Sequence, residues 1–159
     1  MSILKVARMG HPVLRAKARP LDLAEIRSEA VQLLIGDMID TMIEYRGVGL
    51  AAPQVHEGIR LFVGFLDASP DDEVETEPVV VINPEISPVG SEIVEGWEGC
   101  LSVPDIRGRV PRAREIRVRA LDRRGEEIEL HALDFPARVI QHETDHLDGV
   151  LFFERMRSL

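Results

Sequence analysis

The sequence lacks cysteine pairs, an excess of positive charge and long apolar runs. Its single cysteine, Cys100, cannot form an internal disulfide, which excludes small secreted disulfide scaffolds and leaves the thiol buried, free or bound to a metal. The net charge of -9 disfavours nucleic acid and anionic membranes, because both need a basic face. No apolar run approaches the roughly 20 residues that span a bilayer, and the N-terminus is too polar and short for a signal peptide. We therefore expect a cytoplasmic protein.

The composition indicates one ordinary globular domain. A length of 159 residues is close to the usual size of a domain, and a hydrophobic content of 45% is sufficient for one core. No repeat, linker or low-complexity stretch divides the chain. We expect a single domain over residues 1–159.

Periodicity predicts an α+β fold with helices at both ends. From Glu25 to Tyr45 apolar residues recur at helical spacing, which indicates a long N-terminal amphipathic helix. The acidic stretch at 68–78 has no apolar period and is interpreted as a solvated loop. Asp134 can cap a last helix that stops at Gly149. Between the helices, short β-type runs are predicted at 59–65, 79–82, 115–120 and 127–130, the last two joined by a hairpin turn at 122–125. We expect mainly antiparallel strands around a C-terminal helix.

The predicted C-terminal helix carries a motif typical of metal-dependent hydrolases. QHETDHLDG, residues 141–149, places His142 and His146 four residues apart, so both imidazoles project from one face and can share one ion. Glu143 lies one step round the helix, where its carboxylate can take a proton from metal-bound water and pass it to a leaving group. A solvated or buried helix face is the alternative, but the chain has only five histidines, which makes chance a weak explanation.

Two histidines are too few for a catalytic zinc-type site, which usually has three protein ligands and an open position. One protease class has a third histidine at the position of Phe152, and another uses a downstream glutamate, for which Glu154 is the only candidate. The upstream candidates are Glu98, Cys100, His131, His11 and His56. Because a thiolate is the strongest of these donors for a borderline-soft divalent ion, Cys100 is favoured.

Another stretch, GVGLAAPQ at 47–54, combines small residues with an amide side chain. Glycines such as Gly49 let the backbone approach a ligand or another segment closely, and Gln54 offers an amide donor. Taken alone, the stretch is equally typical of a turn after a helix.

GVGLAAPQ, EGCLS at 98–102 and QHETDHLDG, in this order, resemble the motifs of the peptide deformylase family. MGHPVLR near the start, INPE, VPR and GVLFFERM at the end are also similar, so the resemblance runs from about Val6 to Met156. It implies removal of the formyl group from the N-terminal formyl-methionine of new polypeptides, with release of formate. The alternatives are an endo- or aminopeptidase of the HExxH type and an inactive metal-binding homologue.

The resemblance also implies a role for individual residues. It places the metal on Cys100, His142 and His146, with Glu143 as the general acid/base for attack of metal-bound water on the formyl carbon. The Gln54 amide and the Leu101 backbone N–H are expected to form an oxyanion hole. The expected substrate-binding residues are Val48, Gly49, Glu98, Gly99, Arg107, Phe135 and Val139, of which the apolar side chains would form the methionine pocket. Arg107 and Arg112 could alternatively pair with Glu98.

The cofactor implied by the resemblance is one divalent metal ion, usually Fe(II), with zinc, nickel or cobalt as alternatives that the donor set does not separate. The implied partner is a formyl-methionyl peptide. Formylated initiation points to a bacterial-type cytoplasm, or to an organelle if a transit peptide was removed. Some bacterial members carry a longer C-terminal helix linked to ribosome docking. Because this chain stops at Leu159, we expect at most a transient ribosome contact.

Overall fold

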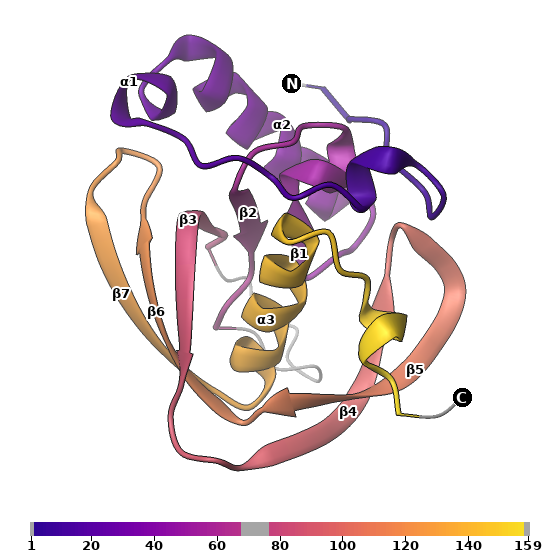
Figure 1. Ribbon diagram of the computed structural model, residues 1–159. Coiled ribbons are helices and arrows are strands. Elements are labelled where there is room, and N and C mark those ends of the chain that lie inside the picture. The colour runs from indigo at the N-terminus through magenta and orange to yellow at the C-terminus, as the bar shows by residue number, and fades with distance from the viewer. Residues whose placement is uncertain (1, 68–76, 158–159) are drawn as a thin grey trace.

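The computed structural model describes residues 2–67 and 77–157 and has an α+β architecture, as predicted (Figure 1). Its α-helices are α1 (Leu23–Ile26), α2 (Glu29–Glu44) and α3 (Phe135–Leu147), and short 3-10 helices occur at η1 (Pro12–Leu14), η2 (Ala52–Val55) and η3 (Phe152–Arg155). The strands are β1 (Gly49–Ala51), β2 (Leu61–Gly64), β3 (Val79–Pro88), β4 (Ile93–Cys100), β5 (Val103–Ala113), β6 (Glu115–Leu121) and β7 (Glu127–Leu133). The acidic stretch predicted as a solvated loop lies outside the described residues except for 77 and 78. No helix in the described ranges is long and apolar enough to cross a membrane.

The N-terminal region contains two helices where periodicity predicted one from Glu25 to Tyr45. Ser28 separates them, because its backbone is extended and its hydroxyl accepts a hydrogen bond from the Val31 N–H, which starts α2. Met38 and Met42 of α2 are fully buried in a cluster with residues of β1, β2 and β3. The second helix therefore supports β1, which lies within GVGLAAPQ, and β2, which follows it.

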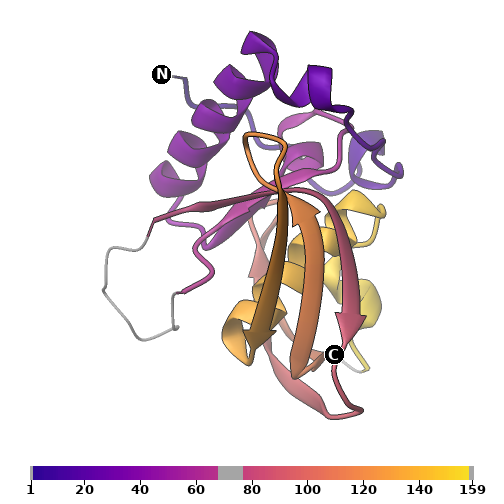
Figure 2. The same cartoon turned by 90° about the vertical axis from the view of Figure 1, so that its left-hand side faces the viewer.

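The strands form two sheets. Five strands pair antiparallel in the order β1-β2-β3-β6-β7 (Figure 2). Within the described residues, β4 pairs with β5 alone. The hairpin turn predicted at 122–125 joins β6 to β7, with Gly125 at a φ of 83° and its N–H bonded to the Asp122 carbonyl. Strand β3 continues beyond its predicted end at residue 82 to Pro88, through an irregularity at which Asn83 has a φ of 52°.

The β4–β5 hairpin was not predicted. Strand β4 reads IVEGWEGC, and of its eight residues only Glu98 is buried, so the apolar alternation that marks a half-buried strand is missing. Asp105, the third residue of β5, has a φ of 65°, in the left-handed region that favours glycine. This hairpin positions Cys100.

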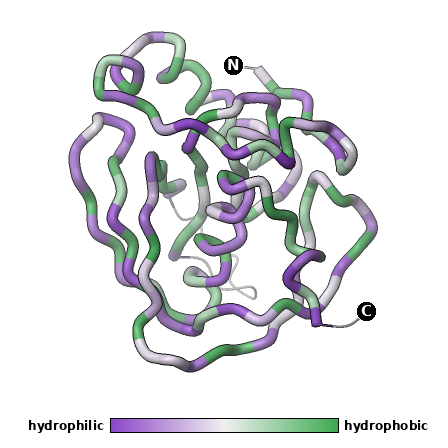
Figure 3. Tube along the Cα trace, viewed as in Figure 1, coloured by the Kyte–Doolittle hydropathy of each residue, from purple (hydrophilic) through white to green (hydrophobic). Residues whose placement is uncertain are grey.

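Helix α3 lies between the five-stranded sheet and the β4–β5 hairpin (Figure 1) and contacts β1, β2, β5 and β7. Ala137, Ile140 and Leu147 are buried in the sheet-facing core, and hydrophilic residues alternate with them along the helix (Figure 3). Gly149 ends the helix as predicted, with a φ of 76° and its N–H bonded to the His146 carbonyl. Asp134 stands at the N-cap position, but its side chain makes no cap hydrogen bond and binds Arg114 instead, contrary to the predicted cap.

Candidate active site

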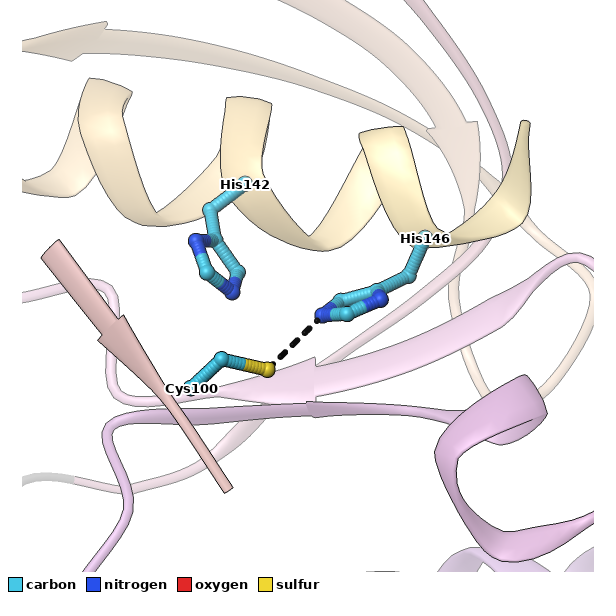
Figure 4. A group of neighbouring side chains, drawn as sticks. All are labelled: Cys100, His142 and His146. Atoms are coloured by element: carbon cyan, nitrogen blue, oxygen red, sulfur yellow. Dashed lines mark hydrogen bonds between the residues drawn. The ribbon is translucent and has the colours of Figure 1, made fainter. Parts of the chain in front are cut away.

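Cys100, His142 and His146 converge where the end of β4 meets α3. Their donor atoms all lie within 4.8 Å of one another, and the Cys100 Sγ lies 3.4 Å from the His146 Nε2. Figure 4 shows both imidazoles projecting from one side of α3 toward the thiol. His142 and His146 lie on one face of α3 because they are four residues apart on a helix. Cys100 reaches them only because β4 runs past the helix.

This donor set fits a divalent ion. An ion about 2.0–2.3 Å from each donor of a tetrahedral site requires donors roughly 3–4 Å apart, which is close to the observed spacing. A thiolate with two imidazoles suits zinc and neighbouring first-row metals. The other residues considered as a third ligand lie elsewhere or are engaged: Glu98 binds the Nδ1 of His142, His131 pairs with Glu115, and His11 packs against His56.

Glu143 is buried beside the three donors. The residue is 4% exposed, and its Oε2 has no hydrogen-bond partner among the described residues. Burial raises the pKa of Glu143 to about 7, close to the value that suits a general base near neutral pH. Gly49 lets β1 pass close to this carboxylate, since a Cβ on Gly49 would lie 2.7 Å from the Glu143 Oε1.

Gln54 is held rigidly next to Cys100. The side chain is 2% exposed, its Oε1 accepts a hydrogen bond from the Ala51 N–H at 3.0 Å, and its Nε2 lies 3.3 Å from the Cys100 Sγ. The same Nε2 donates to the hydroxyl of buried Ser102 at 3.2 Å. Ser102 was missed from the sequence, although it is the last residue of EGCLS, directly after Leu101. The Gln54 amide therefore has a fixed orientation beside the Cys100 thiol.

A cavity of about 970 Å³ opens onto these residues. Its size suits a small organic or peptide ligand. All seven residues predicted to bind substrate line it, namely Val48, Gly49, Glu98, Gly99, Arg107, Phe135 and Val139, together with Gln54, Leu101, Cys100, His142 and Glu143. His146 is 1% exposed and does not line the cavity. Trp97 also lines it and is 62% exposed, which places this indole at the rim.

The carboxylate of Glu98 is engaged on all sides. Arg112 donates two hydrogen bonds to it, both 2.9 Å long, Arg138 donates one of 2.7 Å, and the His142 Nδ1 lies 2.8 Å away. Burial raises the pKa of Glu98, but the hydrogen bonds with Arg112 and His142 outweigh it and hold the value at about 2. Of the two arginines considered as partners for Glu98, Arg112 is the one that pairs with it. Arg107 is exposed and makes no ion pair among the described residues.

Comparisons with known proteins agree on one family. A family model described as polypeptide deformylase matches residues 3–159. Peptide deformylase 2 of Nostoc sp. is 46% identical over 158 residues, which cover 98% of this chain and 87% of that protein. A class I type b peptide deformylase from Acinetobacter baumannii, solved with Met-Ala-Ser bound, is 42% identical with a TM-score of 0.90 and coverage of 98% and 99% of the two chains. The peptide deformylase of Thermotoga maritima is 39% identical with a TM-score of 0.89 and coverage of 99% and 100%.

Proposed function

The chain belongs to the polypeptide deformylase family, whose members use a divalent metal to remove the formyl group from N-terminal formyl-methionine, and we propose how its own residues carry out this reaction. The proposed ligands are Cys100, His142 and His146. The observation that carries the assignment is the convergence of these three donors within 4.8 Å, next to the buried carboxylate of Glu143. We further propose that residues 1–159 act as one catalytic domain, which the match over residues 3–159 supports.

Glu143 is proposed as the general acid/base. A divalent ion bound here would lower the pKa of a coordinated water toward about 7 and polarise the formyl oxygen. Glu143 accepts the proton of the attacking water and returns it to the departing amine, for which its burial and its pKa of about 7 are suited. Its free Oε2 leaves one oxygen available for that proton.

Gln54 and Leu101 are proposed to stabilise the oxyanion. The Gln54 Nε2 is held near Cys100 by the bond between Oε1 and the Ala51 N–H, so the donor needs no reorganisation during the reaction. The two Nε2 hydrogens are directed at the Cys100 Sγ and the Ser102 hydroxyl, and Gln54 lines the cavity, so one of these hydrogens would turn to the oxyanion in the transition state. The Leu101 backbone N–H follows Cys100 directly and would supply the second donor.

The substrate is proposed to lie along the cavity with its methionine side chain against the metal-carrying helix. On α3, Val139 lies one turn before His142 and Phe135 lies two turns before it. Val48 lines the cavity from the segment before β1. Gly49 and Gly99 would let the peptide backbone approach, and Arg107 would bind a peptide carbonyl at the exposed end. The relative that binds Met-Ala-Ser supports a peptide in this position. We reassign Glu98 from substrate contact to support of His142, because its carboxylate is already fully engaged.

Fe(II) is the proposed metal, with zinc, nickel and cobalt as alternatives that the same donors accept. Because the relatives are bacterial, we propose that the protein works in a bacterial-type cytoplasm, where formylated nascent chains are its substrates. A transient contact with the ribosome during that work is also proposed. The amphipathic α2 is proposed as the support for β1, against which its buried methionines pack.

The test of the proposed function is formate release after purification under argon. Wild-type protein loaded with Fe(II) should release formate from formyl-Met-Ala-Ser and should leave unformylated Met-Ala-Ser intact. Glu143→Ala should keep its metal and lose at least about 100-fold in kcat, because a general acid/base is removed. Cys100→Ala should lose both metal and activity.

Three outcomes contradict specific parts of this account. Cleavage of unformylated Met-Ala-Ser would indicate a peptidase. Metal content without formate release would indicate an inactive metal-binding protein. Full metal occupancy and activity in Cys100→Ala would show that the ligand assignment is wrong.

A further inference from the structure

A network of charged side chains connects the candidate ligand His142 with the surface through Glu98, Arg112, Asp145 and Arg155. Arg112, which is 4% exposed, donates through Nε and Nη2 to the two oxygens of Glu98 and through Nη1 to Asp145 at 2.5 Å. Buried charges destabilise a fold unless they are paired and well hydrogen-bonded, and such pairs are often retained because they define one arrangement. Arg112 is thus fixed between two carboxylates, one from β4 and one from α3.

Asp145 extends this network to the C-terminal segment. It lies on α3 between His142 and His146 and is 8% exposed. Arg155 of η3 binds it with a forked pair of hydrogen bonds, from Nε to Oδ2 at 2.6 Å and from Nη2 to Oδ1 at 2.8 Å. The Arg155 side chain is 47% exposed, so Arg155 is the member of the network that faces solvent. A forked guanidinium–carboxylate pair fixes orientation as well as distance.

Glu98, at the other end of the network, sets the orientation of the His142 ring. The Glu98 Oε1 lies 2.8 Å from the His142 Nδ1, and a proton on Nδ1 leaves the lone pair of Nε2 for a metal. Phe152, three residues before Arg155, stacks on the same imidazole with ring centroids 6.1 Å apart and planes inclined by 21°. The C-terminal segment therefore meets His142 directly through Phe152 and indirectly through Arg155, Asp145, Arg112 and Glu98.

We propose that Arg155 is a positioning residue for the metal centre, which acts on His142 through Asp145, Arg112 and Glu98. The proposal rests on the assignment of His142 as a ligand. It gives an exposed residue outside GVGLAAPQ, EGCLS and QHETDHLDG a role in metal retention. It also makes a prediction of sign: loss of a positive charge near a cation site should tighten metal binding by simple electrostatics, whereas loss of a positioning residue should weaken it.

The experiment is a Co²⁺ affinity measurement on metal-free protein under argon, by competition with a chelator. Arg155→Gln should bind Co²⁺ several-fold more weakly, somewhat below the roughly 10- to 100-fold loss typical of residues that bond a ligand directly. The visible absorption bands of the bound Co²⁺ should shift as well, because the orientation of His142 changes. Arg155→Lys keeps the charge and one hydrogen bond, and should recover part of the affinity.

Arg19→Gln is the matched control. Arg19 binds Glu25 in the same forked manner, with contacts of 3.1 Å and 2.8 Å, and is 61% exposed, but neither residue touches the site. This variant should bind Co²⁺ as the wild type does. Wild-type or tighter binding by Arg155→Gln would overturn the proposal, and so would equal losses in Arg155→Gln and Arg19→Gln.

A combined variant tests the route. In a Glu98→Gln background the connection to His142 is already altered, so Arg155→Gln should cause little further loss; independent effects would add. Additive losses would overturn the route through Glu98. If Cys100→Ala lowers Co²⁺ affinity and Arg155→Gln does not, only the positioning role fails, whereas unchanged affinity in Cys100→Ala would contradict the ligand assignment itself.

Discussion

Gly49 shows how closely single residues define this site. A side chain at this position would force Glu143 to move, because its Cβ would lie 2.7 Å from the Glu143 Oε1 and 2.9 Å from the Glu143 Cγ. A glycine here therefore leaves room for the proposed catalytic carboxylate and for the proposed approach of the substrate backbone. The residues alone indicated that small side chains allow a close approach, and the resemblance implied substrate contact at Gly49; the structure adds the close approach to Glu143.

Gly49→Ala should lower kcat by about 100-fold or more, because the new methyl group displaces the Glu143 carboxylate that moves the proton. The measurement is kcat for formyl-Met-Ala-Ser, with metal content determined on the same sample. Gly58→Ala is the control, since a Cβ at Gly58 meets nothing within 4 Å. Wild-type kcat in Gly49→Ala would contradict the placement of Glu143.

Among the elements, α3 was predictable and the β4–β5 hairpin was not. The pattern that places His142 and His146 on one helical face is local, and Gly149 supplies a local stop signal. Strand β4 contains the strand-favouring Ile93, Val94 and Trp97, but Glu98 is its single buried residue, so the alternation of apolar and polar residues that marks a half-buried strand is missing. The motifs could therefore identify Cys100 as a ligand candidate, but the sequence did not show how it reaches the helix.

The same limit explains why the network behind His142 was only partly predicted. Pairing of Arg112 with Glu98 was one of two options, and choosing between them requires the register of β4 on β5. In that register Arg112 lies opposite Val94, on the same face as Glu98, whereas Arg107 lies opposite Gly99, on the other face. The bond from Arg155 to Asp145 depends on how the C-terminal segment folds back over the hairpin. Both are contacts between elements, which periodicity within one element does not encode.

Gly108 of β5 makes the C-terminal segment sensitive to one methyl group. A Cβ at this position would collide with the thioether of Met156, the residue after η3, so in Gly108→Ala this side chain and the segment that carries it must shift. We expect a loss of about 1–3 kcal/mol in the free energy of unfolding, as for overpacked cores. The measurement is urea unfolding of the metal-free protein.

Met156→Ala in the same chain should restore most of that loss, because it removes the colliding atoms. Gly36→Ala on α2, where a Cβ meets nothing within 4 Å, should leave the stability unchanged or raise it. An unfolding free energy of Gly108→Ala equal to that of the wild type would show that the segment has room to adjust.

The buried charges should make the stability of the folded protein depend on acid. The pKa of Glu98 is about 2 in the fold against an ordinary value of 4.5, because hydrogen bonds with Arg112 and His142 outweigh the opposing effect of burial. Its depressed pKa contributes about 3 kcal/mol of stability above pH 4.5, and this contribution is lost as the pH falls toward 2.

Glu98→Gln separates this effect from that of the other carboxylates. The difference in unfolding free energy between metal-free wild type and Glu98→Gln should be largest near pH 6 and should shrink as the pH falls from about 4.5 to 3, as expected for a group with a lowered pKa. Urea titrations at several pH values provide the measurement. A difference that is constant over this range would contradict the ion-paired state of Glu98.

The measurement that tests the central claim most directly is X-ray absorption at the metal edge of the zinc-loaded protein. With Cys100, His142 and His146 as ligands, the spectrum should show one sulfur at about 2.3 Å and nitrogen donors at about 2.0–2.1 Å, and the sulfur should disappear in Cys100→Ser. A wild-type spectrum with only nitrogen and oxygen neighbours, or a sulfur that persists in Cys100→Ser, would contradict a thiolate-bearing deformylase centre in this protein.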